Sequence, residues 1–229
     1  MEQHIVKIIS IDKVTHDVRR YKFEKPAGYK FLPGQATEVS INKPGMEEEK
    51  RPFTFTGLNE WDHLEFTIKS YNDHDGVTKK LGKLVPGDEL IIRDVWGTIN
   101  YKGPGVFIAG GAGVTPFIAI LRDLANRNLI DGNKLIFANK TRADIILEND
   151  FRKILAINFI NILSDEKVEG YECGLISEKF LKEYIGGIKN SDGTQKMFYL
   201  CGAPPMMDAV EKQLNNLGID NNFIVKEEF

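Results

Sequence analysis

Cysteine is scarce in this chain of 229 residues, which contains only Cys173 and Cys201. Two widely separated thiols form neither a disulfide framework nor the clustered spacing of a zinc site. An iron–sulfur cluster needs four thiolates, so we expect none on this chain. We predict no metal site, and any redox chemistry must come from an organic cofactor.

The chain also lacks a large excess of charge and a long apolar run. Its net charge of −3 gives no electrostatic reason to expect nucleic acid as a partner. The most apolar stretch, residues 103–121, is broken by Pro104 and Pro116, whereas a membrane helix needs about 20 continuous apolar residues. The N-terminus shows no apolar segment after a basic start, so we predict no secretion signal. We therefore expect a cytoplasmic protein without a membrane span.

The spacing of apolar residues changes near residue 103, and this change predicts two domains. Before it, short alternating runs bounded by Pro-Gly pairs predict an antiparallel Greek-key β-barrel in residues 1–102. After it, apolar strands alternate with amphipathic helices, which predicts a doubly wound α/β domain with a parallel sheet in residues 103–229. The first half contains the predicted strands Ile5–Ile11, Val18–Phe23, Ala36–Ile41, Arg51–Thr56, Leu64–Tyr71 and Glu89–Asp94. The second contains the predicted strands Val106–Ala109, Lys134–Asn139, Phe159–Leu163, Met197–Cys201 and Phe223–Glu227, and the predicted helices Pro116–Asn126, Asp144–Ile154, Ser177–Tyr184 and Met206–Leu217.

A glycine cluster, Gly110-Gly111-Ala112-Gly113, follows the first strand of the second half. We predict that Thr115 caps the next helix and that Pro116 is its first residue. Glycines let a backbone approach a pyrophosphate, and a helix N-terminus offers free N–H groups. Pro116 replaces the third glycine of the G-x-G-x-x-G fingerprint, however, so the loop by itself indicates a nucleotide site or a structural turn.

A second loop of this kind, Cys201-Gly202-Ala203-Pro204-Pro205-Met206, follows the strand Met197–Cys201 and opens the next helix. In open α/β sheets, ligands bind outside the carboxyl ends of the strands, where both loops lie. Alternatively, Cys201 is a small buried hydrophobic residue and the prolines only start a helix.

A third stretch, Asn139-Lys140-Thr141-Arg142, ends the second parallel strand without an acid that would bind ribose hydroxyls. Lys140 and Arg142 are suited to a 2′-phosphate. Equally, Thr141 and Asp144 fit a capping box for the following helix, which would leave the two cations solvated.

Taken together, these motifs resemble those of the ferredoxin–NADP reductase superfamily. Arg51-Pro52-Phe53-Thr54 is similar to the R-x-Y-[ST] flavin motif, residues 111–116 to the G-x-G-x-T-P nucleotide loop, and residues 201–206 to the C-G-x-P-x-M nicotinamide motif. The resemblance covers essentially the whole chain, with the motifs in the family's order. It implies a flavin-binding barrel followed by an NAD(P)-binding α/β domain.

The resemblance assigns roles to individual residues. It implies that Arg51 pairs with flavin phosphate, that Phe53 packs on the flavin where relatives usually have tyrosine, and that Thr54 hydrogen-bonds the central flavin ring. The remaining residues implied to line the flavin are Pro52, Ile68, Lys69, Tyr71, Gly76, Val77 and Thr78. Gly76-Val77-Thr78 is one residue shorter than the family's helix-start pattern, so FMN stays open beside FAD, the commoner cofactor of the family and the one we expect. The residues implied to bind NAD(P) are Gly111, Gly113, Thr115, Pro116, Asn139, Lys140, Thr141, Arg142, Cys201, Gly202, Pro204 and Met206.

The chain ends Lys226-Glu227-Glu228-Phe229. By the same resemblance, Phe229 stacks on the flavin and Glu227 tunes charge or passes a proton. Thr54, Cys201 and Glu227 are therefore the implied catalytic residues.

The implied activity is hydride transfer from NADPH or NADH to bound flavin, followed by release of electrons to a separate carrier such as ferredoxin or flavodoxin. We expect the protein to act as a monomer. The alternatives are an NAD(P)H:free-flavin reductase, a non-catalytic flavin-binding interaction or sensor module, and a nicotinamide-dependent dehydrogenase without flavin. Basic Lys140 and Arg142 favour NADPH, whereas the stretch Asn139-x-Thr141-x-x-Asp144-Ile145 resembles the NADH-using branch of the family.

Overall fold

The computed structural model describes residues 2–71, 76–97 and 99–226. Backbone contacts divide the chain into two units, one of residues 1–100 with 115–120 and one of residues 101–114 with 121–229. The boundary predicted after residue 102 stays a prediction. Within the described residues, no helix has the length and apolar character needed to cross a membrane.

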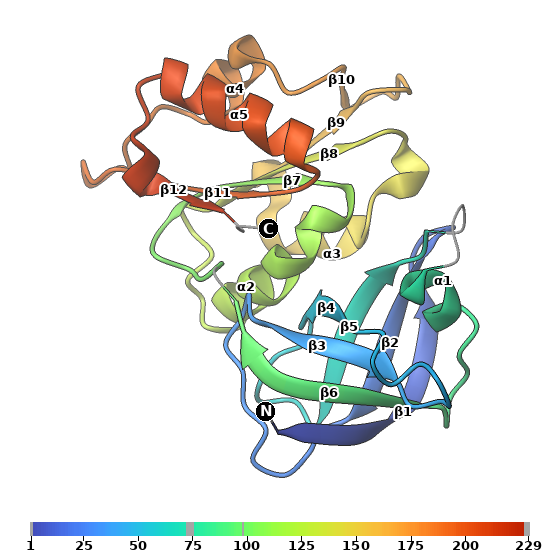
Figure 1. Ribbon diagram of the computed structural model, residues 1–229. Coiled ribbons are helices and arrows are strands. Elements are labelled where there is room, and N and C mark those ends of the chain that lie inside the picture. The colour runs from blue at the N-terminus through green and yellow to red at the C-terminus, as the bar shows by residue number, and fades with distance from the viewer. Residues whose placement is uncertain (1, 72–75, 98, 227–229) are drawn as a thin grey trace. The chain divides into compact units, whose positions relative to one another are not determined.

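The first unit contains a sheet in the order β4-β3-β6-β1-β2-β5. Its pairings are antiparallel throughout. The chain beyond β4 then pairs with β5 through Phe55 and Phe66, and this contact closes the sheet into the predicted barrel (Figure 1). The strands are β1 (Gln3–Lys13), β2 (Val18–Glu24), β3 (Ala36–Ile41), β4 (Arg51–Thr54), β5 (His63–Lys69) and β6 (Glu89–Trp96), and the helix α1 (Val77–Leu81) lies between β5 and β6.

Alternating apolar residues make these segments strands, because every second side chain points into the barrel. Aromatic rings fill its centre. Phe55 lies with its ring centroid 4.3 Å from that of Phe31 and 5.1 Å from that of Phe66, and Phe66 lies 4.6 Å from Phe23. The closure is therefore anchored by aromatic packing, which contributes beyond the area it buries.

A buried polar cluster lies on the outer side of the same closure. The hydroxyl of Thr56 donates to Oε1 of Glu65 over 2.9 Å and lies 3.1 Å from Oγ1 of Thr67. All three residues are buried, and the backbone N–H of Thr56 donates to the carbonyl of Glu65 over 2.9 Å. The carboxylate of Glu65 thus depends on Thr56 for one hydrogen bond out of contact with water.

The second unit is a parallel sheet in the order β10-β9-β8-β7-β11-β12. Figure 1 shows α4 and α5 over one face and α2 and α3 over the other, so the predicted doubly wound α/β domain is confirmed. The strands are β7 (Gly105–Gly110), β8 (Lys134–Asn139), β9 (Phe159–Leu163), β10 (Glu172–Cys173), β11 (Met197–Cys201) and β12 (Ile224–Lys226). The helices are α2 (Thr115–Asn126), α3 (Glu148–Leu155), α4 (Glu178–Tyr184) and α5 (Pro204–Asn216), with 3₁₀ turns η1 (Gly111–Val114), η2 (Arg142–Asp144), η3 (Ala156–Asn158) and η4 (Asn221–Phe223).

Some predicted boundaries are wrong. Helix α2 begins at Thr115 rather than at Pro116, because the preceding 3₁₀ turn brings Val114 into helical geometry as the N-cap. The helix predicted over Asp144–Ile154 is two elements, the turn η2 and α3, separated where Leu147 adopts a positive φ of 53°. Helix α5 begins at Pro204, before the predicted Met206, and the short strand β10 was not predicted.

We expect Thr56→Val to lower the free energy of unfolding by about 1–3 kcal/mol, because the buried Glu65 carboxylate loses a donor while the side-chain volume is kept. Urea unfolding followed by circular dichroism measures this. The control is Thr194→Val in an exposed turn, where a change within about 0.5 kcal/mol is expected. Equal effects of the two substitutions would contradict the role given to the cluster.

Candidate functional site

The parallel sheet reverses its strand order between β7 and β11. The chain runs outward from β7 through β8 to β9 and then returns to place β11 on the other side of β7. Ligands of open α/β sheets bind outside the carboxyl ends of the strands at such a reversal. Both glycine loops singled out in the sequence follow the two strands at this point, so the topology brings them together.

The two loops approach so closely that Gly113 cannot carry a side chain. A Cβ on Gly113 would lie 2.4 Å from the carbonyl oxygen of Cys201, and one on Gly202 would lie 3.2 Å from the backbone nitrogen of Gly110. Gly111 has a positive φ of 52° and open space where its Cβ would be. The arrangement therefore leaves a bare backbone surface at the reversal, directly before the positive N-terminal end of α2.

The prolines of both loops occupy the first turns of α2 and α5. Pro116 is the second residue of α2 and Pro204 the first of α5. A proline there removes no helical hydrogen bond, and its fixed φ preorganises the helix start. Cys201 ends β11 with only 3% of its surface exposed. The side chain of Cys201 is therefore buried beside this backbone surface.

Asn139 is the unusual polar group at this edge. It ends β8, one residue beyond the pairing of Gly110 with Ala138, and is 8% exposed. Neither Oδ1 nor Nδ2 has a hydrogen-bond partner among the described residues. A buried amide without a partner is costly and needs an explanation. A bound ligand with both a donor and an acceptor would satisfy it, so the site fits a polar nucleotide.

Asn133 shows how a buried amide in the same unit is normally held. Its Oδ1 accepts from the backbone N–H of Gly105 over 3.2 Å. Its Nδ2 donates to the hydroxyl of Tyr101 and to the carbonyl of Ile130, both over 3.2 Å. Every polar atom of this side chain is used within the fold, unlike those of Asn139.

The turn after β8 carries the predicted capping box. The backbone N–H and the hydroxyl of Thr141 donate to Oδ2 of Asp144 over 2.9 and 2.8 Å. The box closes η2 rather than a long helix, which corrects the prediction. Lys140 and Arg142 are exposed, as the solvated interpretation predicts.

Arg142 contacts a cluster of acidic and aromatic residues that the sequence analysis does not predict. Its Nε is 3.7 Å from Oε2 of Glu148, and its guanidinium carbon lies 5.4 Å from the ring centroid of Tyr171. Its backbone N–H donates to Oε2 of Glu166 over 2.7 Å. A surface pocket of about 540 Å³ here is lined by Thr141, Arg142, Ala143, Glu148 and Glu166. The acidic run Asp165-Glu166 after β9 was the available signal for this cluster.

Glu148 is the most constrained acid of this pocket. It accepts hydrogen bonds from Nε and Nη2 of Arg152 over 2.9 and 2.7 Å, and another from the hydroxyl of Tyr171. Burial raises the pKa of Glu148, but the hydrogen bonds from Tyr171 and Arg152 and the charges of Arg152 and Arg142 outweigh it. The net effect lowers the pKa. The carboxylate therefore stays ionised at neutral pH.

The predicted flavin motif occupies β4 and is partly open to solvent. Arg51 and Pro52 are exposed, and an Nη1–H of Arg51 donates to the carbonyl of Lys50 over 2.7 Å. Phe53 and Thr54 are half-buried, with the ring of Phe53 6.0 Å from that of Phe66. The strand thus presents a cation and a half-buried hydroxyl to solvent while its aromatic ring packs against the barrel core.

The other predicted flavin residues fall into two groups. Ile68 and Val77 are buried in the barrel core, so only their backbone is available to a ligand. Gly76 is the N-cap of α1, and Oγ1 of Thr78 accepts from the N–H of Tyr71 over 3.4 Å. Tyr71 itself is exposed.

Lys69 is held within the barrel unit by an ion pair. Its Nζ lies 3.0 Å from Oδ2 of Asp17. The contact of Lys69 with the flavin stays a prediction. Nζ of Lys80 in α1 donates to both carboxylate oxygens of Glu49 over 2.9 Å, which ties the segment before β4 to α1. Glu227 and Phe229 lie outside the described residues.

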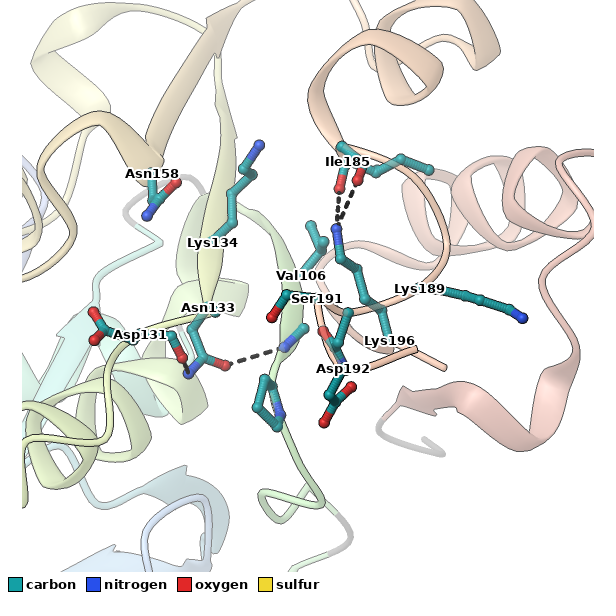
Figure 2. A pocket seen from close by; sticks show the side chains of 15 residues that line it. Val106, Asp131, Asn133, Lys134, Asn158, Ile185, Lys189, Ser191, Asp192 and Lys196 are labelled. Atoms are coloured by element: carbon teal, nitrogen blue, oxygen red, sulfur yellow. Dashed lines mark hydrogen bonds between the residues drawn. The ribbon is translucent and has the colours of Figure 1, made fainter. Parts of the chain in front are cut away.

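The larger of the two pockets described lies at the opposite, amino end of the parallel strands (Figure 2). It has a volume of about 620 Å³ and includes Lys134 and Lys196. Nζ of Lys196 donates to the carbonyls of Ile185 and Gly186, both over 2.9 Å, and Lys134 donates to that of Tyr184. Burial lowers the pKa of both lysines, and for Lys134 the charge of Lys196 adds to this. These cations stabilise the C-terminal end of α4, which accounts for them without a ligand.

Comparison with known proteins identifies both halves. The oxidoreductase FAD-binding domain family matches residues 5–101, and the oxidoreductase NAD-binding domain family matches residues 107–212. The chain belongs to the ferredoxin–NADP reductase-like flavoproteins. This confirms the resemblance inferred from the sequence, and with it FAD and a nicotinamide nucleotide as the cofactors.

Individual relatives place this ferredoxin–NADP reductase-like chain more closely. It is 27% identical over 234 residues to the reductase component of propane 2-monooxygenase of Rhodococcus jostii (strain RHA1), covering 97% of this chain and 62% of the relative. It is 29% identical over 220 residues to NADH-cytochrome b5 reductase 2 of Mycosarcoma maydis, covering 87% and 61%. The chain thus spans about three fifths of the length of these relatives.

The fold has a solved counterpart. A ferredoxin NADP⁺ reductase from Neisseria gonorrhoeae, with bound FAD and NADP, superposes with a TM-score of 0.83 at 18% identity, covering 99% of this chain and 98% of that one. At this identity the likeness shows the shared fold alone.

We expect Asn139→Leu to stabilise the nucleotide-free protein by about 1–3 kcal/mol, because two unpartnered buried polar groups are removed. The same substitution should weaken NAD(P)⁺ binding about tenfold or more, because the amide is lost to the ligand. Urea unfolding and calorimetric titration measure the two effects.

Asn133→Leu is the matched control, since this amide is fully hydrogen-bonded within the fold. It should destabilise the protein and leave nucleotide affinity unchanged. If Asn139→Leu behaves like Asn133→Leu, the amide of Asn139 has no ligand-binding role.

The lowered pKa of Glu148 predicts a pH-dependent contribution to stability. A carboxyl group whose pKa is lower in the folded state stabilises the protein above its unfolded pKa of about 4.5. This contribution is lost as the pH falls through the folded value. We therefore expect Glu148→Gln to destabilise the protein at neutral pH and to differ less and less from wild type toward acid. Urea unfolding at a series of pH values checks this, and a constant difference would contradict it.

Proposed function

We propose that the protein is an NAD(P)H-dependent flavin oxidoreductase that passes electrons to a separate acceptor. The observation that carries the proposal is the presence on one chain of an FAD-binding and an NAD-binding oxidoreductase domain. The bare glycine backbone at the strand-order reversal of the second domain supports it. When bound, FAD accepts a hydride from the nicotinamide and releases electrons one or two at a time.

The residues of the second unit would bind and orient the nucleotide. Gly111, whose Cβ position is open space, would let a pyrophosphate approach the N-terminal end of α2, and Gly113 would support it by letting this loop lie against Cys201. Asn139 would donate to and accept from the bound nucleotide. Cys201 would line the nicotinamide position, where its small buried side chain excludes water and leaves room for the ring. Their common task is to fix the reacting carbon in one orientation.

The residues of the first unit would hold the flavin. Arg51 is exposed and, among the described residues, donates only to the carbonyl of its neighbour Lys50, so its guanidinium can form paired hydrogen bonds to a phosphate. The hydroxyl of Thr54, half-buried at the end of β4, would hydrogen-bond the central flavin ring. Thr78 and the backbone at Gly76 would complete the phosphate contacts. A contact of Lys69 with the flavin would compete with the ion pair that its ammonium group forms with Asp17.

The acceptor is proposed to be a separate electron carrier or oxygenase component. One relative is named the reductase component of propane 2-monooxygenase and another a reductase of cytochrome b5, and both names describe transfer to another redox protein. Comparing the reduction rates of a ferredoxin, a cytochrome b5 and free FMN by the purified protein distinguishes this from the free-flavin reductase.

We expect the purified protein to be yellow, with flavin bands near about 450 nm that disappear on anaerobic addition of NADH or NADPH. Thr54→Ala and Cys201→Ser should each slow the stopped-flow reduction by about tenfold or more, because each removes a group that orients the reacting rings. Thr194→Ala, in an exposed turn, is the control and should reduce at the wild-type rate.

A colourless protein that binds no added FAD would refute the flavoprotein proposal and leave a flavin-independent dehydrogenase. A yellow protein that neither nucleotide reduces would indicate a non-catalytic flavin module. Wild-type rates in both Thr54→Ala and Cys201→Ser would refute only the residue roles.

A further inference from the structure

We infer that the pocket after β8 selects NADH over NADPH, because its own carboxylates occupy the groups that a 2′-phosphate would need. The inference rests on the proposed function and deepens it. It concerns the surface pocket lined by Thr141, Arg142, Ala143, Glu148 and Glu166.

The position of the pocket makes it the candidate for the adenosine ribose. The strand β8 lies beside β7, and both end at the same edge of the parallel sheet. In dinucleotide-binding sheets the pyrophosphate lies at the first strand's loop, and the end of the second strand contacts the ribose hydroxyls or the 2′-phosphate. Thr141 and Arg142 follow the second strand here, so the group at the ribose 2′ position meets this turn.

The backbone donors of this turn are already taken by acids. The N–H of Thr141 donates to Asp144 over 2.9 Å, and the N–H of Arg142 donates to Glu166 over 2.7 Å. The hydroxyl of Thr141 also donates to Asp144 over 2.8 Å. A phosphate would have to displace two carboxylates to reach these donors, and until then it would meet negative charge.

Of the two cations after β8, Lys140 does not line the pocket, and Arg142, which does, is likewise engaged. Nε of Arg142 lies 3.7 Å from Glu148, and its guanidinium lies over the ring of Tyr171. Glu148 is itself held by Arg152 and Tyr171, which fixes its charge in place beside Arg142. The local sequence favours a 2′-phosphate at Arg142 because it does not show the acidic residues that folding brings next to this side chain.

A ribose diol has the opposite requirement. Its hydroxyls donate hydrogen bonds, and ionised carboxylates offer acceptors with free lone pairs. Glu166 lines the pocket, is exposed and accepts one backbone hydrogen bond among the described residues, which leaves acceptor sites for a ribose hydroxyl. The pocket therefore complements a nucleotide without the phosphate and repels one with it.

The direct test is binding to the flavin-loaded protein, measured by calorimetry with ADP-ribose and with 2′-phospho-ADP-ribose as probes. ADP-ribose should bind at least about tenfold more tightly, the effect of one unfavourable charge contact at the edge of a protein. The ratio of kcat/KM for NADH and NADPH should favour NADH to a similar degree.

Two variants test the part played by the carboxylate. Glu166→Gln keeps an acceptor for the N–H of Arg142 but removes the charge, so it should shift both ratios toward the phosphorylated ligand by about tenfold. Glu169→Gln removes an exposed acid of the same loop that does not line the pocket and should leave both ratios unchanged.

The inference is overturned if the wild type binds 2′-phospho-ADP-ribose as tightly as ADP-ribose. It is also overturned if Glu166→Gln shifts the ratios no more than Glu169→Gln does. Failure of the proposed function gives a different result, since neither nucleotide would then reduce the flavin whatever the binding ratio.

Discussion

Backbone contact between two loops is the constraint on which the nucleotide half of this protein depends. Gly113 lies against the carbonyl of Cys201, and Gly202 lies against Met206 and Gly110, so that no Cβ fits between the loops. Because the strand order reverses at this point, the helices α2 and α5 both begin there. A larger residue would separate the loops and displace two helix N-termini together.

Two buried amides of the second unit differ in whether the fold itself satisfies them. Asn133 uses both ends of its amide to tie the turn before β8 to β7, whereas Asn139, at the other end of the same strand, uses neither. The amide of Asn133 therefore completes the fold at the amino end of the sheet, whereas the amide of Asn139 at the carboxyl end is available to a ligand, as expected of a site that trades stability for binding.

The charged residues at the end of β8 show why a sequence motif alone does not define the electrostatics of a binding site. The sequence places Lys140 and Arg142 on either side of Thr141, which suits a phosphate. Folding adds Glu148 from α3 and Glu166 from the segment after β9, which lie in other parts of the chain. The electrostatic potential in a pocket is the sum over all nearby charges. Acidic residues brought in by tertiary contacts can therefore reverse the preference for a phosphate that a local motif suggests.

The sequence by itself determined the two-domain architecture, the barrel, the parallel sheet and the three family motifs, because these follow from local periodicity and contiguous residues. It also named Asn139 and the glycines of both loops as candidate nucleotide-binding residues. Only the tertiary structure decided that Lys69 pairs with Asp17, that the segment over residues 144–154 is interrupted at Leu147, and that acids surround Arg142. Those outcomes depend on partners distant in the chain, which no local pattern specifies.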